Sequence, residues 1–309
     1  MKKRIISVIL ASAFILALTP LNLDAKSYLY VDDDAEGEMD GSYGKPYKKI
    51  QDALDKAAKD DKYVSIRKGT YRENIEIWED LKVYGVDRDD VIIIAKDDDE
   101  PTVIMHDDTT LGKVTVKDGE RGILVEEGDG AVISDCKIVD NDKDGIKAEK
   151  ADRKEKDQLE VYDCYIADNG WNGIYAESRK SNIKDNEIYF NDRDGIELED
   201  DSEASLEDNR FKENGGDGLK VTIDWSEIWI EDNTFYNNDR EGLEIRSSHQ
   251  KEGEIGVKEN KFYKNDRWGV ARIEKRPFCD SQWNNSVYFD KNIFSENKQG
   301  EISPVINVY

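Results

Sequence analysis

Glu207 and Glu231 are the residues whose type and spacing first suggest chemistry. Each stands two positions before an asparagine, Asn209 or Asn233, in a stretch that recurs along the chain. If the recurring stretches stack as neighbouring strands, the two carboxylates lie about one strand spacing, roughly 4.8 Å, apart. Two carboxylates at that distance do not both ionise readily unless a cation lies between them. The pair therefore suggests a Ca²⁺ site, because Ca²⁺ prefers oxygen ligands of this kind.

Side chains suited to binding and deprotonating a sugar occupy related positions in the neighbouring stretches. Lys184 and Lys258 stand at the glutamate position of the flanking copies, and Tyr162 stands there one copy before Lys184. Trp229 and Tyr288 belong to the column two residues earlier and offer flat apolar surface. A metal ion would acidify the proton beside the carboxylate of a uronic acid, and a lysine could remove it. We therefore predict Lys184 and Lys258 as catalytic bases. The same pattern predicts that Trp229, Tyr288 and Tyr162 bind substrate.

Two further sets of charged residues have less specific patterns. The column one residue before the asparagines either solvates a turn or binds cations weakly; it reads Asp135, Asp163, Asp185, Asp208, Asp232, Glu259 and Lys291. The outward positions of the third strand of each copy carry both signs of charge and a single tyrosine, and they form a weaker candidate groove. These residues are Lys147, Glu149, Tyr175, Glu177, Glu197, Glu199, Lys220, Glu244 and Arg246. For the Glu207–Glu231 column itself, the alternative to a site is a solvated sheet face stabilised by Glu–Lys pairs.

A repeat in the last two thirds of the chain positions all of these residues. Successive copies start 22 to 32 residues apart, whereas the offsets inside each copy stay fixed, so the strands are constant and the loops vary. The first column reads Cys136, Cys164, Asn186, Asn209, Asn233, Asn260 and Asn292. Five residues later the second column reads Asn141, Asn169, Asn191, Asn214, Asn238, Asn265 and Asn297. A glycine follows nine residues after the first column in six copies: Gly145, Gly173, Gly195, Gly218, Gly242 and Gly269.

Each copy contains three short apolar clusters whose alternation is typical of half-buried strands. Three short strands in about two dozen residues predict one rung of an all-β, right-handed parallel β-helix. A single rung cannot bury its apolar face, so only the stack is stable. We predict one such domain over residues 26–309, with seven regular rungs over residues 131–302 and less regular, rung-like sequence over residues 62–130.

The asparagine columns have a structural explanation. An inward amide can bond backbone groups that a tight turn leaves unpaired, and it can bond the asparagines above and below. Asparagine also tolerates the left-handed conformation that such turns demand. The glycine before the third strand supplies either a positive φ or a close approach of neighbouring backbone.

The N-terminal segments have different roles. Residues 45–60 contain apolar residues on one helical face, with Pro46 near the start, and we predict a short helix that caps the open end of the stack. Residues 1–25 combine Lys2, Lys3 and Arg4 with a 14-residue uncharged run and resemble a secretory signal peptide. The expected location is therefore extracellular or periplasmic, in a bacterium.

The segments DGSYGKPYKKIQDALDKA, SIRKGTYRENIEI and LKVYG, together with the downstream copies, resemble the pectate-lyase-like superfamily over about residues 28–309. This resemblance implies the parallel β-helix and a range of activities that includes polysaccharide lyases, glycosidases, uronate epimerases and non-catalytic surface proteins. The stretch IWIEDNTF resembles the pectate-lyase strand that carries a calcium-binding Asp before a His. By that resemblance Glu231 is a metal ligand, and Asp232 replaces the His. The predicted metal ligands are thus Glu207, Glu231 and Asp232.

Composition limits the possible partners. The 309 residues carry 70 acidic and 45 basic side chains, for a formal net charge of −25, and include only two His. Nucleic acid is excluded because phosphate contacts need a basic surface, and no later segment is apolar enough to span a membrane. The leading hypothesis is a secreted protein that engages an extracellular polysaccharide, as a Ca²⁺-dependent lyase of uronic-acid glycans. The alternative is a non-catalytic surface or adhesion protein.

The three cysteines are predicted to differ in reactivity. Cys136 and Cys164 occupy the inward column in adjacent copies, where a disulfide is sterically conceivable but two buried thiols are favoured. Cys279 lies outside the repeat columns, in RPFCDSQW, and is expected to react first.

Overall fold

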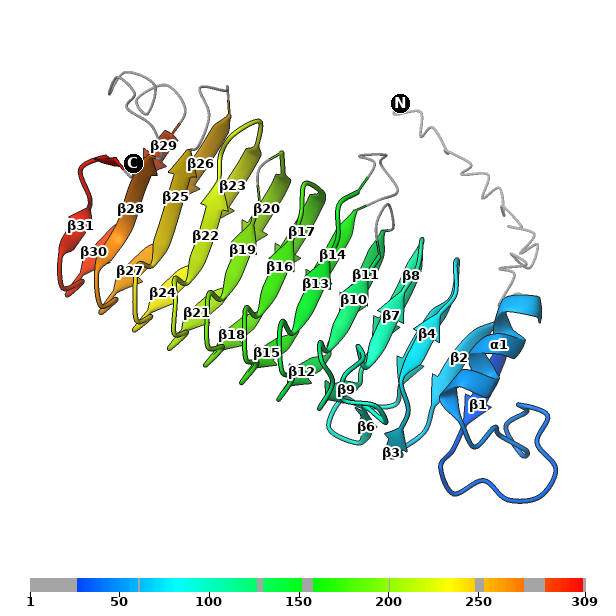
Figure 1. The fold of residues 1–309 in the computed structure, drawn as a ribbon. Coiled ribbons are helices and arrows are strands. Elements are labelled where there is room, and N and C mark those ends of the chain that lie inside the picture. The colour runs from blue at the N-terminus through cyan, green and yellow to red at the C-terminus, as the bar shows by residue number, and fades with distance from the viewer. Residues whose placement is uncertain are drawn as a thin grey trace, which may run out of the picture.

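The computed structural model describes residues 27–60, 62–126, 130–151, 158–199, 201–247, 253–274 and 287–307. The predicted signal peptide, Cys279 and His249 lie outside these residues. Three parallel sheets wind around one long core, and a single helix, α1 (Ile50–Asp60), lies at the N-terminal end of the described chain (Figure 1). The prediction of an all-β, right-handed parallel β-helix with three strands per rung is confirmed. None of the described helices is long and apolar enough to cross a membrane.

The first sheet has 11 strands. In order along the stack they are β1 (Tyr28–Val31), β2 (Tyr63–Ile66), β5 (Lys82–Gly85), β8 (Thr109–Gly112), β11 (Ala131–Ser134), β14 (Leu159–Tyr162), β17 (Lys180–Lys184), β20 (Glu203–Glu207), β23 (Glu227–Glu231), β26 (Glu254–Lys258) and β29 (Val287–Asp290).

The second sheet has 10 strands. They are β3 (Gly69–Arg72), β6 (Val91–Ile94), β9 (Thr115–Lys117), β12 (Lys137–Val139), β15 (Tyr165–Ala167), β18 (Glu187–Tyr189), β21 (Arg210–Lys212), β24 (Thr234–Tyr236), β27 (Lys261–Tyr263) and β30 (Ile293–Ser295).

The third sheet, like the first, has 11 strands. They are β4 (Ile75–Ile77), β7 (Val103–Met105), β10 (Ile123–Val125), β13 (Ile146–Ala148), β16 (Ile174–Ala176), β19 (Ile196–Leu198), β22 (Leu219–Thr222), β25 (Leu243–Ser247), β28 (Trp268–Glu274) and β31 (Gly300–Ile302), with β32 (Ile306–Asn307) also paired to β28.

Inward side chains of the same kind stack from rung to rung. Phe211, Phe235, Phe262 and Phe294 form a continuous stack in the second sheet, with ring centroids 4.7, 4.6 and 5.1 Å apart. The first three are fully buried. Because each phenylalanine contacts the next, the apolar surface of one rung is covered only by its neighbours, and stability is shared along the stack.

Both asparagine columns form hydrogen-bonded ladders. In the first column the side-chain amide of Asn209 donates to Asn233 Oδ1 at 3.0 Å and to the backbone oxygen of Ile183 at 2.8 Å. The backbone N–H of Asn209 donates to the same Asn233 Oδ1 at 2.9 Å. The second column repeats this arrangement, as in the bond from Asn214 to Asn238 at 3.0 Å. The predicted structural role of these columns is confirmed.

The left-handed residues of the turns are not the asparagines of the two ladders, contrary to the expectation from sequence, but the residues immediately before them. At the first turn these are the acidic column, for example Asp208 with φ 55° and Asp232 with φ 57°. At the second turn Glu213 and Asn237 have φ 57° and 56°. The asparagine is free to point inward because its predecessor takes the strained φ, and aspartate accepts that conformation more readily than most residues do. Turn geometry thus accounts for much of the acidic column.

The repeated glycines serve close approach rather than positive φ. A β-carbon at Gly195 would lie 2.4 Å from the backbone oxygen of Gly218, and Gly195 is absent from the positive-φ glycines of the described chain. Any side chain here would separate adjacent rungs.

Helix α1 covers the N-terminal end of the core, within the predicted range of residues 45–60. Ile50, Leu54 and Ala57 are fully buried and the helix packs on β1, β2 and β4. It begins at Ile50 because Glu73 accepts the free backbone N–H groups of Ile50 and Gln51, at 2.9 and 3.2 Å. A capping side chain from a distant part of the chain sets the helix start, which local sequence does not reveal.

Candidate functional site

The first sheet places both predicted bases and two of the three predicted metal ligands, Glu207 and Glu231, in one outward column, whereas Asp232 lies in the turn after β23. Strand pairing aligns Lys184 of β17 with Glu207 of β20, Glu207 with Glu231 of β23, and Glu231 with Lys258 of β26. Tyr162 of β14 is aligned with Lys184. The four charged residues therefore follow one another along four adjacent rungs.

The two glutamates turn toward lysines rather than toward each other. Lys184 Nζ lies 3.0 Å from Glu207 Oε2, and Lys258 Nζ contacts Glu231 Oε1. A hydrogen bond to Glu207 raises the pKa of Lys184, and a hydrogen bond to Glu231 raises the pKa of Lys258. A general base needs the opposite shift. The column as it stands has the geometry of a Glu–Lys ladder, and the base assignment remains a prediction.

Flat aromatic surface lies beside this column. Trp229 is 45% exposed, and its six-membered ring lies over Gly256 on β26. Tyr288 on β29 is aligned with Gly256 and is 50% exposed. Because Gly256 has no side chain, the indole can occupy its place in the column. Trp229 and Tyr288 thus form an aromatic shelf across three rungs, roughly 10 Å long.

An open polar groove of about 500 Å³ adjoins the aromatic shelf. Hydroxyl, amide and carboxylate groups from adjacent strands line it together with the indole of Trp229. Its lining residues are Gln158, Lys180, Ser181, Asn182, Glu203, Ala204, Ser205, Glu207, Glu227 and Trp229. A concave surface with one aromatic wall and many hydrogen-bonding groups suits a hydroxyl-rich ligand.

The acidic residues that converge include two of the three predicted metal ligands. Glu231, Asp232 and Glu259 each present an oxygen within 4.8 Å of the others, whereas Glu207 is not part of this group. Lys291 Nζ lies 3.0 Å from Glu259, and Lys258 binds Glu231. The three carboxylates fit the ligand chemistry of Ca²⁺, but two lysines already neutralise two of them.

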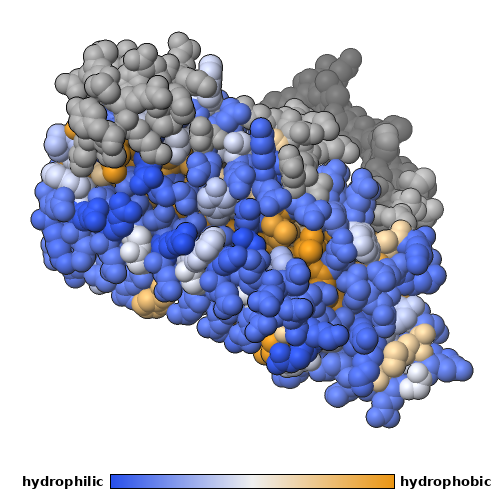
Figure 2. Space-filling model, in the orientation of Figure 1, coloured by the Kyte–Doolittle hydropathy of each residue, from blue (hydrophilic) through white to orange (hydrophobic). Residues whose placement is uncertain are grey.

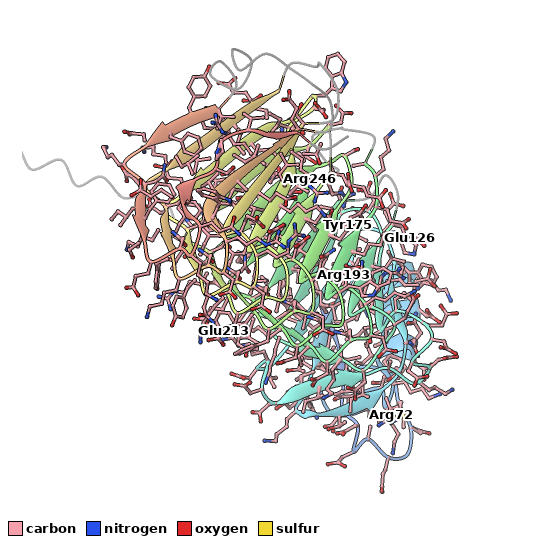
Figure 3. All side chains as sticks on the ribbon, turned by 60° about the vertical axis from the view of Figure 1, so that its left-hand side comes forward. Arg72, Glu126, Tyr175, Arg193, Glu213 and Arg246 are labelled. Carbon is pink, nitrogen blue, oxygen red and sulfur yellow. The ribbon has the colours of Figure 1, made fainter. Side chains whose placement is uncertain are left out.

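The outer face of the third sheet holds more deeply placed charges than the sequence suggested. Lys220 Nζ contacts Glu197 and lies 3.4 Å from Asp194 Oδ2. Although burial disfavours its charge, the contact with Glu197 and the charge of Asp194 raise the pKa of Lys220. Burial, together with Glu199, raises the pKa of Tyr175. Figure 3 labels Glu126, Tyr175 and Arg246 on this face.

His106 belongs to the same face. Its Nε2 lies 2.7 Å from Glu76 Oε1 and its Nδ1 lies 3.2 Å from Glu126 Oε2. The ring stacks on Trp78 with centroids 5.5 Å apart and planes 4° from parallel. The sequence does not reveal this cluster, because its residues come from three consecutive rungs and meet only through the register of the strands. Figure 2 shows that this face is mainly hydrophilic, with apolar residues gathered over β7 and β10.

Comparison with known proteins gives one family and a set of similar folds. The family model described as the right handed beta helix region matches residues 102–248 and 172–303. No curated protein sequence matches the chain.

Several solved structures share the fold at low sequence identity. The A-module of the mannuronan C-5 epimerase AlgE4 of Azotobacter vinelandii has a TM-score of 0.54 at 14% identity, covering 89% of this chain and 97% of that one. XylC in complex with xylose has a TM-score of 0.57 at 10% identity, covering 89% and 86%. Pectate lyase Pel9A has a TM-score of 0.55 at 11% identity, covering 91% and 78%. At such identities these likenesses establish the fold alone.

Proposed function

The chain belongs to the right-handed β-helix family, and from this premise we propose that it binds an extracellular polysaccharide along its first sheet. One observation carries the proposal. Trp229 and Tyr288 form an exposed aromatic shelf on a rigid sheet, and a polar groove adjoins it. Sugar rings present an apolar face to aromatic side chains and hydroxyl groups to polar ones, so the shelf and groove match both sides of a glycan. The similar folds of AlgE4, XylC and Pel9A are consistent with this class of ligand.

The expected location agrees with such a ligand. Residues 1–25 have the pattern of a secretory signal, and the protein would meet polysaccharide outside the cell or in the periplasm. Acidic charge on the same face favours neutral segments of a glycan, or acidic segments that cations bridge.

A calcium-dependent lyase is the catalytic form of this proposal. Glu231, Asp232 and Glu259 would hold the ion, which would acidify the proton beside a uronate carboxylate. Lys258 would lose its partner when Glu231 turns toward the ion, and its pKa would fall toward that of a working base. Lys184 stays paired with Glu207, and it would act as a base only if that ion pair were also broken. Glu207 would position Lys184 through their ion pair and would not be a ligand of the ion.

The alternative is a glycan-binding or adhesion protein without catalysis. The ion pairs of both lysines favour this alternative, because an ammonium group that is hydrogen-bonded to a carboxylate is a poor base. The two forms share the aromatic shelf and differ only in whether the bound glycan is cleaved.

Binding and catalysis can be tested separately. Glycan-array or affinity-gel measurements should show binding by the parent protein and its loss in Trp229→Ala. Phe190→Ala is the matched control, because Phe190 is similarly exposed but lies at a turn after the second sheet. Equal binding by both variants would contradict a site at the aromatic shelf. Incubation of the parent protein with polyuronates and Ca²⁺ should then release an ultraviolet-absorbing unsaturated product if the lyase form is right, and a bound but intact glycan identifies the non-catalytic form.

A further inference from the structure

A third ladder runs through the second turn of the rungs, and it is largely acidic. Its members stand directly before the repeated glycines: Asp144, Asn172, Asp194, Asp217 and Glu241. One side-chain oxygen of each of the first four accepts the backbone N–H of the next, at 3.2, 3.1, 2.7 and 3.0 Å in order along the stack. The asparagine and the aspartates therefore have the same structural role here, and each fills it with one oxygen.

The second oxygen is what distinguishes the members of this ladder. Asp194 Oδ2 lies 3.4 Å from Lys220 Nζ. Asp217 Oδ2 and Glu241 Oε2 are buried, and no hydrogen-bond donor within the described part of the chain reaches either atom. The residues themselves are 0% and 3% exposed. One carboxyl oxygen of Asp217 and one of Glu241 lie within 4.8 Å of each other. An unpaired buried carboxylate oxygen is costly, and a second carboxylate close by adds to that cost.

The charged groups around this pair come from several neighbouring segments. A carboxyl oxygen of Glu244 on β25 lies within 4.8 Å of oxygens of both Asp217 and Glu241. The other groups that face the cluster are Asp194 and Glu197 on the preceding rung, Lys220 on β22, Arg246 on β25, Arg240 in the turn and Arg267 from the next turn. Five carboxyl groups thus face four cationic side chains, so one negative charge is left over.

A metal ion does not fit the remaining space, because Arg240 already takes the cationic position. Its Nη2 donates to Glu244 Oε2 at 3.1 Å. Its Nη1 lies 3.9 Å from Asp217 Oδ2 and its Nε lies 3.6 Å from Glu241 Oε2, both beyond hydrogen-bonding distance. The guanidinium group faces all three carboxyls but leaves two oxygens without a donor.

We propose that Asp217 and Glu241 share one proton, held between Asp217 Oδ2 and Glu241 Oε2 inside the β-helix. A single proton gives both oxygens a hydrogen bond and removes the excess negative charge. This arrangement needs no ligand and no group from outside the chain.

The surroundings of the pair favour the protonated form. Burial raises the pKa of Asp217 well above its usual range, and the charge of Glu244 raises it further. Arg240 opposes this shift, but it is held by Glu244 and reaches neither unpaired oxygen.

The shared proton makes the stability of the folded protein depend on pH in one direction. The folded protein holds a proton that the unfolded chain releases near an ordinary carboxyl pKa, about 4. Between that value and the higher folded pKa, the folded state binds more protons, so its stability falls as pH rises. The pair therefore stabilises the protein in weakly acidic surroundings, and its contribution is lost as pH rises through the folded pKa.

Asp217→Asn tests the shared proton directly. Asparagine keeps Oδ1 for the N–H of Glu241 and offers a permanent N–H donor to Glu241 Oε2, and Asn172 shows that this ladder accommodates the residue. Asp194→Asn is the matched control, since it removes the same charge from the same ladder but disrupts a contact with Lys220. We expect the stability of Asp217→Asn, relative to the parent protein, to increase as the pH is raised from about 5 to about 9, whereas that of Asp194→Asn does not.

Infrared spectroscopy gives an independent readout. A carboxylic-acid C=O band that persists at neutral pH in the folded parent protein should be absent from Asp217→Asn and present in Asp194→Asn. An Asp217→Asn protein that is less stable than the parent at every pH, or a parent protein without that band, would overturn the proposal.

Discussion

The indole of Trp229 lies in the place that a side chain at residue 256 would fill: a β-carbon on Gly256 would come within 2.3 Å of the ring. Because residue 256 has no side chain, the indole lies against the sheet and extends the aromatic shelf toward Tyr288, which is aligned with Gly256. A ring that rests on the backbone loses little conformational freedom when a ligand stacks on it, which favours binding.

Gly256→Ala should therefore weaken glycan binding without touching the ligand. The new methyl group displaces the indole, whose far end is free to move, so we expect binding to fall toward that of Trp229→Ala with little change in stability. Tryptophan fluorescence should report the displaced ring. Gly112→Ala is the matched control, because it disturbs Tyr84 in the same sheet but leaves the aromatic shelf intact. Unchanged glycan affinity in Gly256→Ala would show that the position of the indole is irrelevant to binding.

Asn209→Ala and Asn233→Ala should each destabilise the β-helix by about 1–3 kcal/mol, since each leaves buried backbone and amide groups unpaired. Denaturant midpoints measure the effect. Asn182→Ala serves as the control, because Asn182 is exposed on β17 in the same region. Asn284, which the sequence places between copies and for which no loss is expected on substitution, lies outside the described residues. Similar midpoints for Asn182→Ala and the two ladder variants would refute the buried ladder.

The sequence was sufficient to predict the strands and their register. An asparagine ladder forms only when equivalent residues of adjacent rungs stack on one another. The equivalent positions of Asn209 and Asn233 in the repeat therefore predict that the two residues are aligned in space. The outward column from Lys184 to Lys258 follows from the same register.

Side-chain orientation could not be predicted in the same way. Glu207 and Glu231 are neighbours by register, but each turns to a lysine on its other side, because an ion pair is more favourable than facing carboxylates. The set Glu231, Asp232 and Glu259 combines two columns and depends on the left-handed φ of Asp232 and Glu259. The acidic ladder of the second turn depends on side-chain placement too, because the unpaired oxygens of Asp217 and Glu241 follow from the position of Arg240.

Calcium should raise the melting temperature, because an ion that binds only the folded state stabilises it by mass action. Thermal scans with millimolar Ca²⁺ and with EDTA test this expectation. Glu259→Gln should abolish the calcium-dependent shift, whereas Glu254→Gln, which removes the same charge from an exposed position on β26, should keep it. Identical midpoints with Ca²⁺ and EDTA in the parent protein would eliminate a calcium site.

Native-state labelling should separate the three cysteines. Cys136 and Cys164 are free thiols, and both are buried at the head of the first asparagine column. Burial raises the pKa of Cys164 well above its usual value, which keeps the reactive thiolate scarce. We expect slow labelling of both residues in the folded protein, rapid labelling of Cys279, and full labelling of all three cysteines after denaturation. Three rapidly labelled thiols in the folded protein would contradict the buried column. A mass about 2 Da low that recovers on reduction would instead reveal a disulfide between the two stacked residues.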